Sequence, residues 1–195
     1  MREEVTALLE NRNELLTITY FKIQELFDKK YGENALVLME IGTFFEVYEV
    51  NNEKEKIGKA KEIAELLNIQ LTRKNKSILE NSKENPIMAG VPAISFEKHL
   101  ARIIAEQKYT IAIIRQKGTP PNVSRYLDVV VSPGTNFDFV VEQDDNFITS
   151  IVIDQIRGNY LIGYSAIDVT TAKCYYNEVF GTNEDKFFAL DEVFN

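Results

Sequence analysis

The fold is decided by residues 36–49, which read Leu36-Val37-Leu38-Met39-Glu40-Ile41-Gly42-Thr43-Phe44-Phe45-Glu46-Val47-Tyr48-Glu49. Two apolar runs meet at a glycine, a pattern that predicts two strands joined by a tight turn. Because successive side chains of a strand point to opposite faces, the second run places Phe44, Glu46 and Tyr48 on one face. Phe45 and Val47 then lie on the other face, which is typical of a core. On the first face, a ring and an acid two residues apart can reach one ligand together.

Outward from this stretch, helical and strand patterns alternate. Apolar residues at helical spacing predict helices at residues 3–30, 51–68 and 95–107. Strands are expected at residues 69–73, 109–115 and 126–131, with loops at 74–85 and 116–124. This alternation predicts an α/β fold in which helices flank a mixed β-sheet.

A domain boundary is expected at the acidic segment 136–146, which has the composition of a linker. The first domain then spans residues 1–135, and a second begins at residue 147 and continues to residue 195. Its patterns predict strands at residues 147–153, 160–167 and 172–178, followed by helical spacing at 184–195. These elements are too few to complete a domain, so we expect the chain to be an N-terminal fragment of a longer protein.

Composition excludes several classes of protein. Of the 195 residues, 45% are hydrophobic and 27% charged, which is typical of a soluble globular protein. The acidic N-terminus is unlike a signal peptide, and no apolar run reaches membrane-spanning length. With Cys174 as the single cysteine and His99 as the single histidine, we expect no disulfide framework and no Cys/His metal site. A reducing cytoplasm fits this cysteine usage.

The net charge of −8 hides a basic middle segment. Residues 69–126 hold 10 basic and 4 acidic side chains, whereas residues 127–195 hold 3 basic and 12 acidic ones. Exposed cations are commonly just solvated surface, but clustered ones can also contact phosphates. The candidates for contacts with a nucleic-acid backbone are Arg73, Lys74, Lys76, Arg115, Lys117 and Arg125.

The central stretch and four later motifs together resemble the MutS family of DNA mismatch-repair proteins. Gly42-Thr43-Phe44-Phe45-Glu46 is similar to the family's Gly-Asp-Phe-Tyr-Glu. In the same order along the chain follow Gln70-Leu71-Thr72-Arg73-Lys74 (Leu-Thr-x-Arg), Pro86-Ile87-Met88-Ala89-Gly90-Val91-Pro92 (Pro-Met-Ala-Gly-Val-Pro), Ile111-Ala112-Ile113-Ile114-Arg115-Gln116 (Val-Ala-Ile-x-Glu-Gln) and Ser132-Pro133-Gly134-Thr135 (Thr-Pro-Gly-Thr). Departures include Thr43 for the family's aspartate, Ala93-Ile94 for Tyr-His and Arg115 for a glutamate.

The resemblance implies a mismatch-recognition domain followed by the start of an RNase H-like connector domain. It implies that Phe44 wedges beside a mispaired or unpaired base of double-stranded DNA, including small loops. Glu46 would hydrogen-bond that base, either accepting or donating. The family protein is an ATP-dependent homodimeric clamp with a MutL-like partner. Because no P-loop motif occurs here, its ATPase, with ATP and magnesium, would lie outside this chain, in which we expect no catalytic residue.

Other interpretations remain open at this point. Phe44 could be an ordinary core aromatic, as periodicity alone would favour, and Glu46 could equally be a solvated carboxylate. The module could bind branched or other non-B DNA, or a protein through the Phe44 face. Asp154 and Asp168, each at a strand end, could hold the metals of an RNase H-like nuclease. A Phe44 ring sealed in the interior would refute the wedge.

Overall fold

The structure, a computed structural model, describes residues 1–132, 147–168 and 171–181. The chain divides into two compact units, Met1–Pro133 and Gly134–Asn195, and each is described by itself. The expected linker at residues 136–146 lies outside the described residues, so that boundary stays a prediction.

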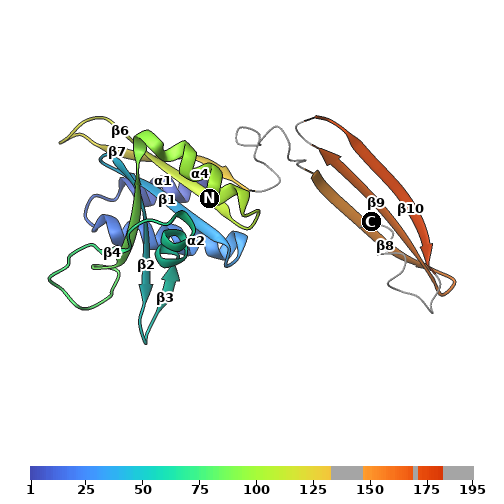
Figure 1. The fold of residues 1–195 in the computed structure, drawn as a ribbon, viewed down its shortest axis with the longest axis horizontal. Coiled ribbons are helices and arrows are strands. Elements are labelled where there is room, and N and C mark those ends of the chain that lie inside the picture. The colour runs from blue at the N-terminus through green and yellow to red at the C-terminus, as the bar shows by residue number, and fades with distance from the viewer. Residues whose placement is uncertain (133–146, 169–170, 182–195) are drawn as a thin grey trace. The chain divides into compact units, whose positions relative to one another are not determined.

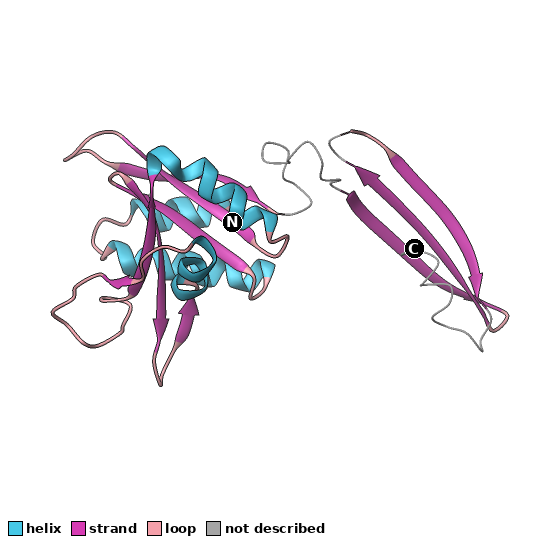
Figure 2. Cartoon of the chain, viewed as in Figure 1, coloured by secondary structure: helices cyan, strands magenta, loops and turns pink. Residues whose placement is uncertain are grey.

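The first unit is built around a mixed sheet. Its elements are α1 (Arg2–Glu10), α2 (Leu16–Tyr31), β1 (Ala35–Ile41), β2 (Phe44–Asn51), β3 (Lys56–Gly58), α3 (Ala60–Leu67), β4 (Thr72–Arg73), β5 (Ile87–Pro92), a 3₁₀ helix (Ala93–Ser95), α4 (Phe96–Ala105), β6 (Thr110–Lys117) and β7 (Ser124–Val131) (Figures 1 and 2). The strand order is β4-β5-β2-β1-β6-β7, with β3 also paired to β2. Strand β1 runs parallel to β6, and the other pairs are antiparallel. The predicted mixed sheet flanked by helices is confirmed.

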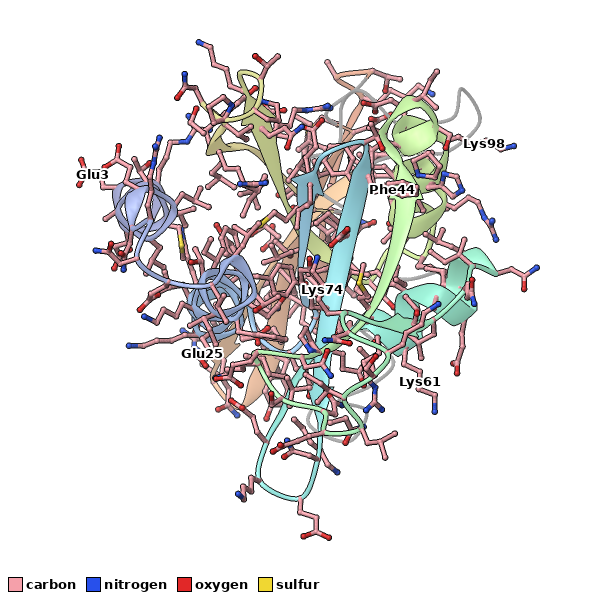
Figure 3. The ribbon with its side chains drawn as sticks, turned by 90° about the vertical axis from the view of Figure 1, so that its left-hand side faces the viewer. Glu3, Glu25, Phe44, Lys61, Lys74 and Lys98 are labelled. Carbon is pink, nitrogen blue, oxygen red and sulfur yellow. The ribbon has the colours of Figure 1, made fainter. Side chains whose placement is uncertain are left out.

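Helices cover both faces of this sheet. Figure 3 views it so that α1 and α2 lie to the left of β1 and β2, with α3 and α4 to the right. The side chains of β1 alternate between the two faces of the sheet. Val37 and Met39 join the core beneath α1 and α2, and Leu36 and Leu38 are buried on the opposite face. The sheet is therefore a central layer with apolar side chains packed on both of its faces.

The predicted helix at residues 3–30 was wrong, because two helices occupy this segment. Asn11 interrupts the helical pattern: its side-chain oxygen accepts a hydrogen bond from the backbone N–H of Asn13 at 3.2 Å. Such local bonds offer the backbone an alternative to the helix. Helix α2 starts again at Leu16 and carries the buried Tyr20 and Phe21 onto the sheet.

The predicted helix at residues 51–68 was also wrong over its first half. The side-chain oxygen of Asn52 accepts the backbone N–H groups of Lys54 and Glu55, both at 2.8 Å, and so closes a turn rather than capping a helix. The chain then returns as β3 alongside β2, and α3 begins only at Ala60. Gly58 allows this return, because its φ is +84° and a Cβ there would lie 2.0 Å from the carbonyl oxygen of Tyr48.

The other elements of this unit match the expectation with shifted ends. The strand expected at 69–73 shrinks to β4, and the loop at 74–85 is confirmed. The helix expected at 95–107 is α4, and the strands expected at 109–115 and 126–131 are β6 and β7. The loop expected at 116–124 is shorter, because β6 extends to Lys117 and β7 begins at Ser124.

The second unit contains the three successive strands that the sequence predicted. They are β8 (Phe147–Ile156), β9 (Asn159–Asp168) and β10 (Cys174–Gly181), and they form an antiparallel sheet in the order β10-β9-β8. The helical pattern at residues 184–195 lies outside the described residues. No helix in the described part of the chain is long and apolar enough to span a membrane.

Candidate functional site

A two-residue turn presents the start of β2. Ile41 of β1 pairs with Phe44 of β2, so Gly42 and Thr43 alone connect the strands. Gly42 has a φ of +63°, whereas Thr43 does not have a positive φ. This is the pattern of a type II′ hairpin turn, which places glycine first and whose twist matches that of the flanking strands. Thr43 therefore fits the turn although it departs from the family motif.

Two neighbouring segments hold this turn in place. The side-chain amide of Gln116 accepts the N–H of Gly42 at 3.0 Å and donates to the carbonyl oxygen of the same residue at 2.9 Å. On the other side, the N–H of Ala93 donates to the carbonyl oxygen of Thr43 at 2.8 Å. The turn is therefore fixed from β6 and from the 3₁₀ helix at the end of β5.

Phe44, the first residue after the turn, is open to solvent. It is 44% exposed, whereas the next residue, Phe45, is 1% exposed and stacks on Phe96 with ring centroids 3.6 Å apart. Figure 3 shows Phe44 at the turn end of β2. The interpretation of Phe44 as an ordinary core aromatic is therefore wrong, because the alternation of β2 sends Phe45 into the core in its place.

Glu46 lies on the same face and is held by two donors. Its carboxylate oxygen Oε2 accepts hydrogen bonds from the hydroxyl of Tyr48 and, at 3.1 Å, from the ammonium of Lys74. Its side chain is only 12% exposed. Opposite it on β5 stands Gly90, where an added Cβ would lie 3.5 Å from the Glu46 Cγ. The interpretation of Glu46 as a freely solvated carboxylate is therefore wrong.

Tyr48 shows how the face of β2 changes along the strand. It lies on the predicted face, but its ring is buried against Tyr20 and Phe21 of α2, with ring centroids 4.8 and 6.5 Å away. Burial, reinforced by the nearby Glu46 carboxylate, raises the pKa of the Tyr48 hydroxyl, which stays a neutral donor. The sequence did not predict this contact, although the two-residue spacing places both side chains on one face.

Three of the six basic candidates have exposed side chains: Lys74, Lys76 and Lys117. Lys74 lies beside β2 (Figure 3) and bonds to Glu46 and Tyr48. Arg73 belongs to the half-buried group and donates to the carbonyl oxygens of Ile78 and Leu79, which ties the loop after β4 back to that strand.

Arg115 and Arg125 bond to groups of other strands and, for Arg115, of α4. Arg115 pairs with Asp128 at 2.9 Å and with Glu97 at 3.2 Å. Although burial opposes its charge, these hydrogen bonds raise the pKa of Arg115. Its guanidinium also lies 5.4 Å from the ring centroid of Phe45. Arg125 donates to the carbonyl oxygen of Glu40 at 3.1 Å. Contacts of these six residues with phosphate stay a prediction.

One apolar residue near the turn was not proposed from the sequence. Ile94, in the 3₁₀ helix, is 99% exposed and follows directly after Ala93, whose N–H bonds to Thr43. Single exposed aliphatic side chains are common on protein surfaces, so this exposure alone assigns Ile94 no role.

The nuclease interpretation was wrong. In the second unit Asp154 pairs with Leu161, and Asp168 lies at the other end of β9, opposite Phe147. Seven residues of extended chain separate the two positions, about 23 Å, which is far too long for a shared metal site. Asp168 instead accepts the N–H of Thr171 at 3.3 Å and closes a turn. Among the residues that the structure describes, no cluster of three potential metal ligands occurs.

Together, these features define a mixed-sheet α/β domain that presents one aromatic ring and a neighbouring carboxylate from a fixed hairpin. The family model of MutS domain I matches residues 20–140, so the chain belongs to the MutS family.

Individual relatives extend this match. A MutS homolog of Acanthamoeba polyphaga mimivirus is 30% identical over 191 residues, which cover 94% of this chain and 17% of the relative. The DNA mismatch repair protein MutS of Fusobacterium nucleatum is 28% identical over 170 residues, 84% of this chain and 17% of the relative. The MutS of Streptococcus thermophilus is 30% identical over 175 residues, 86% of this chain and 18% of the relative. The chain thus spans less than a fifth of the length of these relatives.

We expect Gln116→Ala to loosen the turn without removing a core side chain. Two hydrogen bonds to Gly42 are lost, and the free energy of unfolding should fall by about 1–2 kcal/mol. Urea unfolding of the 195-residue chain measures this loss, and hydrogen exchange at the Gly42 amide should accelerate. Gln70→Ala, at an exposed glutamine, is the control and should change neither quantity. Unchanged Gly42 exchange in Gln116→Ala would contradict the role given to the amide.

Proposed function

We propose that this chain binds double-stranded DNA at mismatched or unpaired bases, with Phe44 as the wedge. The observation that carries the proposal is the exposure of Phe44 at a turn that is fixed on both sides. A wedge must keep its position while it pushes between stacked bases, so it needs a rigid base. The membership of the chain in the MutS family supports this reading.

Selectivity then arises from the cost of deforming DNA. Opening a base step costs a few kcal/mol, and less where pairing is already damaged. Stacking of a base on an aromatic ring returns roughly 1–3 kcal/mol. This return offsets the cost at a mispair but hardly at a paired step. The site would therefore detect weakness in the duplex without reading a sequence.

Glu46 adds a second criterion. A carboxylate close to the phosphates of a duplex is repelled, so its presence weakens binding to intact DNA. At a mispair the carboxylate can accept a hydrogen bond from a base N–H that no longer has a partner. Repulsion from paired DNA and attraction at a mispair then act in the same direction.

The wider role of the protein is part of the same proposal. We expect Lys76 and Lys117, the exposed candidates without an acidic partner among the described contacts, to carry more of the phosphate binding than Arg115 or Arg125. In the whole protein, we propose an ATP-dependent homodimeric clamp with a MutL-like partner in the cytoplasm. Its ATP and magnesium would bind outside this chain.

We expect Phe44→Ala to reduce the preference for mismatched over paired DNA by about fivefold or more, because a stacking contact of roughly 1–3 kcal/mol is lost. Fluorescence anisotropy with the whole protein measures this preference on two duplexes that have the same sequence except for one mispair. The control is Tyr126→Ala on β7, since Tyr126 is 43% exposed and thus as open as Phe44. An unchanged ratio in Phe44→Ala would refute the wedge. A preference for branched DNA over both duplexes would instead favour the alternative ligand.

We expect Glu46→Ala to tighten binding to fully paired DNA more than binding to a mismatch, because repulsion disappears from both but a hydrogen bond is lost only at the mismatch. Competition between the two duplexes at two salt concentrations measures the change. Glu53→Ala removes the same charge from an exposed loop position and is the control. Equal or weaker binding of Glu46→Ala to paired DNA would count against this role.

A further inference from the structure

We infer that Lys74 and Tyr48 are positioning residues that set the mismatch preference through Glu46, an inference that rests on the proposed function. Both donate to the same carboxylate oxygen, Oε2. Among the described residues, no side chain or backbone group donates to the second oxygen, Oε1. The carboxylate is thus fixed through one oxygen, and the other is left to accept a hydrogen bond from a base.

The ammonium of Lys74 is itself held at three points. It lies 3.1 Å from Glu46 Oε2, 3.0 Å from the hydroxyl oxygen of Tyr48 and 5.3 Å from the centroid of the Tyr48 ring. A long lysine side chain normally loses much freedom when it is fixed in one geometry. Here three simultaneous contacts offset that loss, and two of them are with Tyr48, whose ring is buried in the core.

The backbone that carries Lys74 is also fixed. Its N–H donates to the carbonyl oxygen of Pro86 at 3.0 Å. The following loop is closed by the buried side chain of Asn85, whose amide donates to the carbonyl oxygens of Ile78 and Glu80, both at 3.1 Å. Lys74 therefore approaches Glu46 from a rigid frame and not from the end of a mobile loop.

This arrangement separates two roles that a lysine near DNA can have. A phosphate contact weakens binding to every duplex alike when it is removed, and leaves the ratio between mismatched and paired DNA unchanged. A lysine that orients Glu46 changes that ratio, because only the mispair offers Glu46 a donor. Such an effect must also vanish once Glu46 can no longer act as a carboxylate.

The test is a double-mutant cycle in the whole protein, with the mismatched-to-paired affinity ratio as the readout. Lys74→Met should lower the ratio about threefold to tenfold in the wild-type background and leave it unchanged in the Glu46→Gln background. Lys76→Met, the exposed neighbour, should lower both affinities together in both backgrounds. A Lys74→Met ratio that stays constant, or that falls equally in both backgrounds, overturns the inference.

Tyr48→Phe provides a second variant that keeps the ring in the core and removes only the hydroxyl. It should lower the ratio, as Lys74→Met does, with the urea midpoint of the first unit little changed. An unaltered ratio also overturns the inference.

Phe44→Ala in the same assay distinguishes a failure of the proposed function from a failure of the inference about Lys74 and Tyr48. If Phe44→Ala keeps the full ratio, the proposed function fails. If Phe44→Ala removes the preference for mismatched DNA while Lys74→Met and Tyr48→Phe keep the wild-type affinity ratio, only the inference about Lys74 and Tyr48 fails.

Discussion

The structure of this site depends on the way that the Gly42-Thr43 turn is fixed. The positive φ of Gly42 lets two residues reverse the chain, and the amide of Gln116 then binds the peptide groups of Gly42 on both sides. Gln116 lies on β6, which is separated from β2 by β1. The side chain therefore joins the end of the hairpin to a third strand. Without this connection, a hairpin end would fray as other strand ends do.

The exposure of the site also depends on how far α2 extends over β2. Its Tyr20 and Phe21 cover the Tyr48 position, so that end of the face is core. Phe44, four residues earlier on the same face, receives no such cover and remains open. Glu46 lies between the two, with its carboxylate bonded to the Tyr48 hydroxyl. One strand thus passes from core to exposed surface within five residues, and the buried Tyr48 directly holds the largely covered carboxylate of Glu46.

The sequence predicted what depends on periodicity. The alternation of β2, the burial of Phe45 and the mixed sheet all follow from it. It failed where side chains bind the local backbone: Asn11 divides the first helix, and Asn52 turns the chain back into β3. The exposure of Phe44 needed tertiary information, because only the position of α2 decides which residue of that face is covered.

Counting charges along the sequence does not show which cations have an acidic partner in the fold. Residues 69–126 hold 10 basic and 4 acidic side chains, yet Arg115 is neutralised by Asp128 and Glu97, and Lys74 by Glu46. Glu97 is already counted in that segment, but Glu46 and Asp128 lie outside it, so the segment's net charge omits two acids that pair with its cations. Fewer cations without an acidic partner mean weaker nonspecific attraction to any duplex. In the proposed function this favours discrimination, because weak backbone binding leaves the stacking of Phe44 and the hydrogen bond of Glu46 to decide where the protein stays.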